Sequence, residues 1–350
     1  MPHEPIRLIL SATAVAVALV FGWAALDLLL LVFAGLLVAQ LLLGLVGLLR
    51  RSTGMPHGWA LAAVCLALTG ALILGALLLA PALSEQWSEL VDSLPSSFEQ
   101  ARASLRGSSL GRWLGEAIPN PDVLKDMLAR LAGGSGVVRR VTGLFSTAFG
   151  ALVSAVLVAF LGLFFAAQPQ VYRDGLVRLI PPERRLRAQE VLGRVGETLR
   201  WWILGKAISM TLVAALSGLG LWLLGVPLAL ALGLIAGLLG FIPNFGPVLA
   251  VVPAALVALS QSAASAGYVL LLYGGIQLAE SYVLTPLVQQ RTISLPPGLI
   301  LGTQVVLGGL LGALGLALST PMLAAAVVMI DMLYVQDVLH DEPGPRGAAR

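Results

Sequence analysis

Long apolar runs separated by short polar breaks are the dominant pattern along the chain. About 20 consecutive apolar residues suffice to cross the hydrocarbon core as a helix. No segment alternates apolar and polar residues as barrel strands do, so the runs predict a bundle of membrane helices. The first run is long enough for two crossings, which we expect to turn near 23–27. The runs lie at 6–49, which Asp27 breaks, and at 59–81, 141–168, 199–224 and 268–288.

Two later runs contain helix breakers. Proline removes a backbone donor and glycine permits turns that other residues resist, so the chain is expected to bend near Asn244. The apolar pieces 228–242 and 248–259 are short for complete crossings, which favours a re-entrant hairpin over two tilted crossings. A second interrupted run covers 298–318 and 322–334. We expect hinge or re-entrant positions at Gly240, Pro243, Gly246, Pro247, Pro286 and Pro321.

These elements predict an all-α polytopic membrane protein with about eight crossings, counting re-entrant or broken helices. Between the third and fourth spans, apolar residues recur at a three-and-four spacing, which indicates a small helical insert. The expected organisation is three spans in 1–82, an extracytoplasmic insert in 83–143, a fourth span in 144–168, a basic cytoplasmic loop in 169–197, a transport core in 198–339 and a cytoplasmic tail in 340–350.

Composition and charge placement support this picture. The chain is 58% hydrophobic and 11% charged, against about 25% charged residues in soluble proteins. Arginines cluster at one set of span ends, and the loops at the opposite ends, near 225–227 and 260–267, contain no lysine or arginine. The positive-inside rule then places both termini in the cytoplasm.

Glu280 is the strongest candidate for a functional side chain, because ionisable groups near span centres are rare and costly. It belongs to a polar stripe in which residues recur three and four positions apart on one helix face. Lipid cannot satisfy such a stripe, so it must face other helices, water or a solute. Ordinary hydrogen bonding between helices is the alternative explanation. The stripe comprises Gln277, Glu280, Ser281, Thr285 and Gln289.

Other polar residues within apolar runs are weaker candidates. Asn244 at the expected bend, Gln304 and Asp331 are candidate substrate or ion ligands, although Asp331 lies late enough in its span to approach the headgroups. Asp27 fits a hairpin turn better than a site. Lys206 fits an interfacial anchor better than a site, since its long stem can snorkel toward the headgroups.

Glycines mark the segment around Gly308. The Gly308 to Gly312 spacing is a GxxxG close-packing face, which is common in membrane helices.

Enzymatic activity is not expected. The GSSLG sequence at 107–111 matches a nucleophile elbow by letters, but no strand precedes it. All three histidines lie in tails or loops, and no cluster of metal-ligating residues or Walker-type phosphate loop is present. We therefore assign no catalytic residue, metal, cofactor or nucleic-acid partner.

Three segments resemble the autoinducer-2 exporter family, whose members are also called PerM-like permeases. They are GFIPNFGPVLAVVP at 240–253, ESYVLTPLVQQRTISLPP at 280–297 and GGLLGALGLALSTPMLAA at 308–325. The resemblance implies a bacterial inner-membrane secondary transporter, a homo-oligomer with pentamers expected, and re-entrant elements that move in an elevator-like way. Some relatives are regarded as exporters of a furanone signal and others as sodium–proton antiporters. Tyr282 departs from the family pattern, where Asn is frequent.

Three functions remain open at this stage. The first is export of a small polar solute, with alternating access around Asn244, Gln277, Glu280 and Gln304 and with Glu280 coupling a proton or cation. The second is cation–proton antiport at Glu280, with Asp331 as a possible partner. The third is a non-transporting scaffold that binds a partner through its insert.

Overall fold

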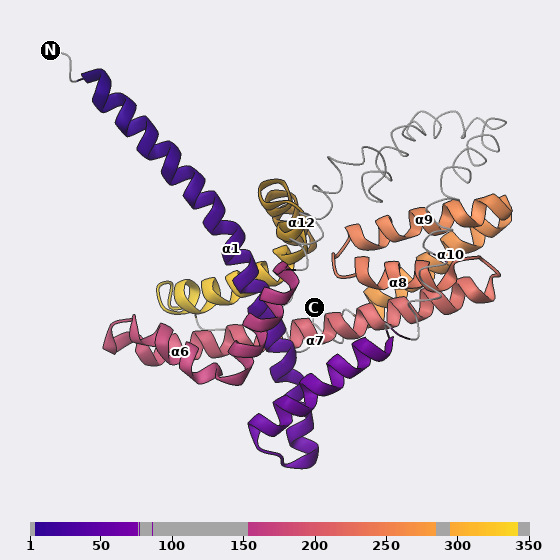
Figure 1. Cartoon of the computed structure of the whole chain (residues 1–350), viewed down its shortest axis with the longest axis horizontal. Helices are drawn as coiled ribbons and strands as arrows, with labels where there is room; N and C mark the ends of the chain where they lie inside the picture. Colours follow the sequence, from indigo (N-terminus) through magenta and orange to yellow (C-terminus); the bar gives the residue numbers. More distant parts are fainter. Residues whose placement is uncertain (1–3, 76, 78–85, 87–152, 285–294, 342–350) are drawn as a thin grey trace. The chain divides into compact units, whose positions relative to one another are not determined.

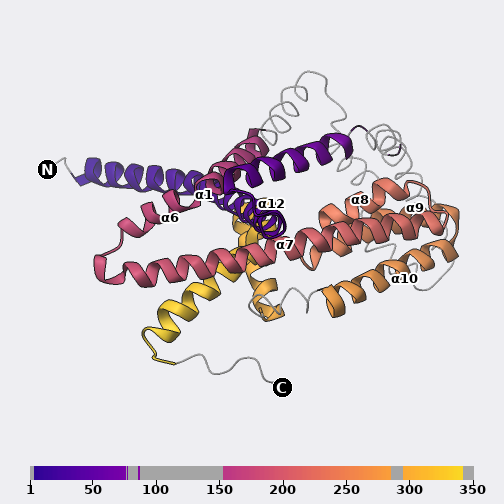
Figure 2. The ribbon, with the colours of Figure 1, turned by 90° about the horizontal axis from the view of Figure 1, so that it is seen from below.

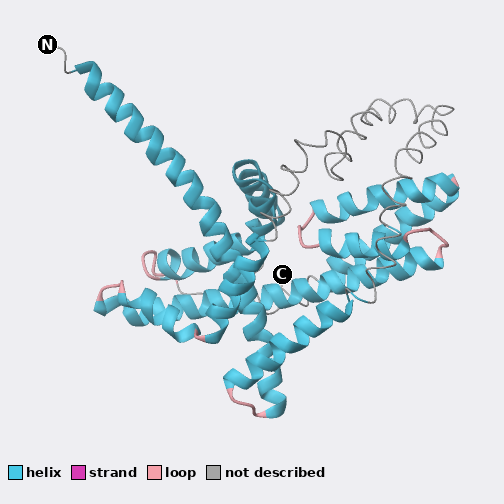
Figure 3. Cartoon of the chain, viewed as in Figure 1, coloured by secondary structure: helices cyan, strands magenta, loops and turns pink. Residues whose placement is uncertain are grey.

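The protein is described by a computed structural model, which covers residues 4–75, 77, 86, 153–284 and 295–341. Helices joined by turns and short loops account for these residues, with no strand among them (Figures 1 and 3), which confirms the all-α prediction. The chain divides into a first unit, 1–52 with 153–200 and 295–350, and a second unit, 53–152 with 201–294. The predicted insert helices and Pro286 lie outside the described residues.

Helix α1 (Glu4–Thr53) is one continuous helix of 50 residues (Figure 1). The turn predicted near 23–27 is therefore wrong, and Asp27 lies within the helix instead of at a hairpin tip. The prediction rested on hydrophobic length and on Asp27 as a polar break, whereas this stretch has no proline and only Gly22 as a weak breaker. Continuous helical hydrogen bonding is the outcome that such a sequence favours.

The core of the first unit forms where α1 packs against α7 (Arg185–Leu223) and α12 (Pro297–Ile330). α1 and the helix Val153–Ala167 approach closely at two glycines. A Cβ on Gly35 would lie 2.7 Å from the Leu161 Cβ, and one on Gly162 would lie 2.7 Å from the Val38 Cβ. Such small residues let membrane helices pack tightly. Leu30, Leu37, Leu199, Leu318 and Ala325 fill this core.

The segment predicted as a basic loop, 169–197, is largely helical. It contains α6 (Pro169–Arg178), a short turn of 3₁₀-helix η1 (Pro182–Arg184) and the start of α7 (Arg185–Leu223). Pro169 begins α6, a position where the missing N–H costs nothing. Arg185 donates from Nε to the Ile180 carbonyl at 3.1 Å and from Nη2 to the Arg178 carbonyl at 3.4 Å. These bonds satisfy carbonyls that the end of a helix leaves free.

Helix α12 (Pro297–Ile330) reverses direction at Gly312, where φ is 66° and ψ is −150°. Essentially only glycine occupies this backbone region. Across the reversal, a Cβ on Gly308 would lie 3.4 Å from the Leu316 Cβ, although eight residues span about 12 Å along a straight helix. Pro321, predicted as a hinge, is instead buried within the second half, and the helix continues through it. Asp331 then begins a π-helical turn, η3 (Asp331–Gln336).

The second unit contains the C-terminal part of α7 with α8 (Ala229–Leu239), α9 (Phe245–Gln261) and α10 (Ala263–Ala279), which lie side by side in Figures 1 and 2. Glycines bring α7 and α8 into backbone contact, since a Cβ on Gly233 would lie 2.6 Å from the Gly218 Cα. A π-helical turn, η2 (Glu280–Leu284), follows α10.

The predicted bend near Asn244 is present, because α8 ends at Leu239 and α9 begins at Phe245. Asn244 has φ 66°, a left-handed conformation that Asn tolerates better than most residues. The Gly246 N–H donates to the Ile242 carbonyl at 2.9 Å, and a Cβ on Gly246 would overlap the Leu239 carbonyl oxygen. Glycine is thus required for the close turn of this helical hairpin.

The spanning helices agree with a polytopic membrane protein. α8 has 11 residues and α9 has 17, so α8 reaches about half-way across a hydrocarbon core of about 30 Å. Among the described residues, four helices are long and apolar enough to cross, or five if the bent pair 153–178 counts as one: Leu28–Thr53, His57–Gly75, Pro182–Leu223 and Pro297–Gln336.

Candidate transport site

Glu280 forms the centre of a polar cluster between α7 and α10 in the second unit. The Lys206 Nζ lies 3.5 Å from the Glu280 Oε1, and both side chains are only 13% exposed. The Ser209 hydroxyl donates to the same carboxylate oxygen at 2.5 Å. An ion pair with a supporting hydrogen bond makes a buried carboxylate tolerable, since an isolated charge in such a place is very costly.

Helix geometry brings these three side chains together. Lys206 and Ser209 are three residues apart on α7, so they lie on the same helix face. Glu280 follows α10 directly and begins the π-helical turn η2. π-Helical turns interrupt regular helices and are frequent at functional sites. Apolar sequence surrounds the cluster on both helices. Lys206 and Ser209 lie within Pro182–Leu223, which is long and apolar enough to cross a membrane, and charged groups are rare in such segments.

Two further buried hydroxyl groups lie along the same helix pair. Ser217 on α7 and Tyr273 on α10 are both buried, and the Tyr273 hydroxyl lies against the Ser217 side chain. Neither oxygen makes a well-formed hydrogen bond to a residue that the structure describes. Ser217 is two turns along α7 from Ser209, and Tyr273 is two turns before Glu280. The four residues therefore continue one polar path between the helices.

The other predicted residues of the second unit lie around this cluster or at the hairpin. Gln277, one turn before Glu280, donates from Nε2 to the Ser281 hydroxyl at 3.3 Å. Both residues belong to the predicted stripe, although Ser281 is exposed while Glu280 faces α7. Asn244 is exposed at the turn between α8 and α9. Thr285 and Gln289 lie outside the described residues.

Gln304 and Asp331 belong to the first unit. Gln304 is fully buried within α12, as expected for an amide whose hydrogen bonds are made inside the protein. Asp331 begins η3 and accepts a hydrogen bond from the Gln336 Nε2 at 3.1 Å. Both ionisable candidates, Glu280 and Asp331, thus begin π-helical turns.

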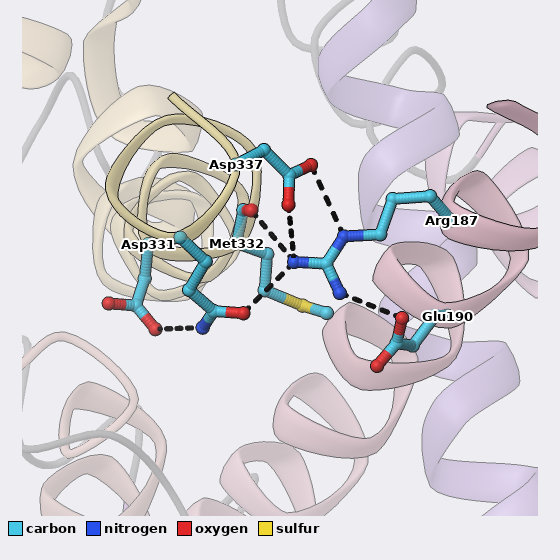
Figure 4. A network of polar contacts seen from close by, with 6 residues as sticks. Arg187, Glu190, Asp331, Met332 and Asp337 are labelled. Atoms are coloured by element: carbon cyan, nitrogen blue, oxygen red, sulfur yellow. Dashed lines mark hydrogen bonds and ion pairs between the residues drawn. The ribbon is translucent and has the colours of Figure 1, made fainter. Parts of the chain in front are cut away.

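Arg187 at the start of α7 holds the end of η3 in a dense polar network (Figure 4). Its guanidinium contacts both Asp337 oxygens, with Nη2 2.9 Å from Oδ1 and Nε 3.2 Å from Oδ2. Nη2 also donates to the Met332 carbonyl and to the Gln336 Oε1, each at 2.9 Å, and Nη1 pairs with Glu190 at 2.7 Å. Gln336 joins this network to Asp331, because its Nε2 donates to the Asp331 carboxylate.

The structure changes the interpretation of Lys206. The sequence favoured an interfacial anchor, whereas the ammonium group pairs with Glu280 and is largely buried. Sequence reasoning also missed Ser209, Ser217 and Tyr273. No group of three or more His, Cys, Asp or Glu side chains in the described part of the chain is arranged to hold a metal ion.

The fold and this cluster together define a class: a multi-pass helical membrane protein with a charged pair set between apolar helices. Comparison with known proteins makes the assignment more specific. The family model described as AI-2E family transporter matches residues 9–334. The chain therefore belongs to the AI-2E family of transporters.

Individual relatives agree with this assignment. MT0215 of Mycobacterium tuberculosis is 30% identical over 295 residues, which are 78% of this chain and 74% of that protein. YueF of Bacillus subtilis is 23% identical over 251 residues, 70% of this chain and 68% of that protein. YrrI of Bacillus subtilis is 28% identical over 180 residues, 51% of this chain and 50% of that protein, so the match spans half of its length. All three are provisionally named transport proteins.

Proposed function

We propose that this protein is a secondary transporter that exports a small polar solute across the bacterial inner membrane, with Glu280 as the coupling carboxylate. The ion pair between Lys206 and Glu280 carries the proposal. Ionisable side chains inside apolar helices usually serve a solute or ion pathway, because their burial is costly. Membership of a transporter family supports the same role.

Coupling follows from the charges of the pair. With Glu280 ionised, its charge balances that of Lys206, and the cluster carries no net charge. A proton on Glu280 removes the partner of the ammonium group and turns a hydrogen-bond acceptor into a donor. Ser209 can both donate and accept, so it accommodates either form. Protonation thus changes which groups the cluster offers to a solute.

A neutral, hydroxylated solute suits the polar path between α7 and α10. Ser217 and Tyr273 present buried hydroxyl groups that lack a well-formed partner among the described residues. Buried polar groups normally have hydrogen-bond partners, and hydroxyl groups of a solute can supply them. The proposal includes an elevator-like movement of the two helical hairpins, the one around Asn244 and the one around Gly312. It also includes cytoplasmic termini and a homo-oligomer.

Cation–proton antiport is the second candidate. The observation that favours it is the pairing of a carboxylate with a serine hydroxyl on one oxygen, because hard cations such as sodium prefer oxygen ligands. In this alternative the cation replaces the Lys206 ammonium beside Glu280.

Flux measurements in proteoliposomes separate the two functions. Under the exporter proposal, a labelled furanone of the autoinducer-2 type leaves the vesicles when a pH gradient is imposed, and Glu280→Gln abolishes this efflux. Glu183→Gln, which removes an exposed carboxylate in η1, is the control and leaves efflux unchanged. Sodium-dependent dissipation of the pH gradient without furanone flux would instead establish the antiporter. If neither flux requires Glu280, its proposed role is excluded.

A further inference from the structure

We propose that α6 is an in-plane membrane helix whose arginines bind the headgroups of anionic phospholipids. The first observation is its direction. The apolar helix Val153–Ala167 ends at Gln168, and α6 leaves it at an angle of 84°. The Phe165 and Tyr172 rings meet edge to face across this bend, with centroids 4.8 Å apart. If the first helix crosses the bilayer, a right-angled neighbour runs along its surface.

The second observation is the distribution of apolar side chains around α6. With about 100° between successive residues, four large side chains fall within one arc of about 140°. All four are exposed within the first unit, up to 83% for Leu179, whereas Val177 on the opposite side is buried. α6 therefore packs against protein at Val177 and leaves the apolar arc open. The exposed arc comprises Val171, Tyr172, Leu176 and Leu179.

The third observation is the position of the charges. Arg178 lies about 20° beyond one edge of the apolar arc, Arg173 lies about 60° beyond the other edge, and Arg184 follows in η1; all three are exposed. The acidic residue Asp174 lies about 60° beyond the edge that Arg178 borders, on the polar side of the helix. A helix with an apolar face bordered by arginines lies in the interfacial plane, where the arginines reach phosphate groups.

Anionic lipid fits this surface better than another protein does. The preceding helix also exposes large apolar residues, among them Phe160 and Phe164, as a lipid-facing helix does. Anionic headgroups gather on the cytoplasmic leaflet and attract basic segments beside a span. This role is independent of the transported solute.

Spin labelling tests the position of α6. Cys65 is the only cysteine, so a Cys65→Ser chain accepts one nitroxide at Leu176→Cys or, as the matched control, at Asp174→Cys. In liposomes of phosphatidylcholine and phosphatidylglycerol, the label at 176 should collide more with oxygen than with a water-soluble nickel chelate, and the label at 174 should show the reverse. Equal access of the chelate to both positions would overturn the proposal. A label at 176 that neither reagent reaches would also overturn it, because a second copy would then cover the face.

Lipid-dependent stability tests the arginines. The wild-type protein should melt at a higher temperature in nanodiscs containing phosphatidylglycerol than in phosphatidylcholine alone. Arg173→Gln/Arg178→Gln should lose more than half of this difference. Arg194→Gln is the control and should keep it, since Arg194 already pairs with Glu197 at 3.1 Å. An undiminished difference in the double variant would refute headgroup binding.

Discussion

The Lys206 ammonium group lies 3.5 Å from the Glu280 carboxylate across the contact between α7 and α10. Removing either charge alone leaves the other buried without its partner. Glu280→Gln and Lys206→Met should each lower the free energy of unfolding by about 3–5 kcal/mol, whereas the double variant should lose less than the sum, with a coupling energy of about 1–3 kcal/mol. Denaturant unfolding of all four proteins in one detergent measures this coupling. Strict additivity would show that the two charges do not interact.

Ser209 should contribute more to stability and to efflux than the exposed Ser281 does. Its hydroxyl donates to the Glu280 carboxylate, and hydrogen bonds to charged groups contribute about 1.5–3 kcal/mol. Ser209→Ala should therefore destabilise the protein by that amount and lower pH-driven efflux.

The control for this prediction is Ser281→Ala, because Ser281 is exposed and contacts Gln277 instead. Its effect should stay within about 0.5 kcal/mol. Equal effects of the two alanine substitutions on efflux would argue against a role for Ser209 in coupling.

Two glycines of the second unit should not tolerate alanine. A Cβ on Gly246 would overlap the Leu239 carbonyl oxygen, and one on Gly233 would lie 2.6 Å from the Gly218 Cα. We expect either substitution to cost at least about 1–3 kcal/mol, as overpacking does in a filled core. Gly275→Ala in α10 is the control, since its Cβ would meet open space; it should leave stability unchanged or raise it by up to about 1 kcal/mol. Thermal unfolding compares the three variants.

Gly312 should also be sensitive to alanine substitution, but because of its backbone conformation. No neighbour lies within 4 Å of a Cβ there, but its φ of 66° is unfavourable for any side chain. Gly312→Ala should cost about 1–3 kcal/mol through backbone strain, and distances between spin labels on the two halves of α12 should lengthen. Gly309→Ala, which also meets open space but has no positive φ, should change neither quantity. An unchanged label distance in Gly312→Ala would contradict the requirement for glycine.

Arg187 should not be replaceable by lysine. Its planar guanidinium reaches both Asp337 oxygens and the Met332 carbonyl at once, which a single ammonium group cannot do. Arg187→Lys should cost about 1 kcal/mol, a small value because Asp337 is partly exposed and salt screens the pair. Limited proteolysis near the end of η3 measures whether this segment detaches from Arg187. Arg194→Lys, in a simple exposed pair with Glu197, should show no release.

Sequence patterns predicted the helical class and the bend near Asn244, because each depends on local chemistry. They also singled out Glu280, which lies in the ion pair with Lys206. The partner of Glu280 was missed, although the same spacing rule could have found it. Lys206, Ser209 and Ser217 recur three and eight residues apart on α7, which makes a polar stripe matching the one on α10. The position of Lys206 within two turns of Arg200 indicated snorkelling instead.

Other predictions were wrong because a residue type or a run length alone does not determine where a helix breaks. Pro321 indicated a break in α12, but a proline removes only one hydrogen bond and a packed helix can continue through it. The reversal occurs at Gly312, since a glycine can adopt the backbone angles that the turn requires. Similarly, the length of the first apolar run suggested a turn, whereas α1 contains no strong helix breaker at 23–27.

The contact between Gly246 and the Leu239 carbonyl has a mechanical consequence for the hairpin of α8 and α9. Space at this point is too small for even one methyl group, so the two helices cannot slide past each other at the turn or close further. A solute gate formed by this hairpin would therefore keep its two helices together at the turn as it moves.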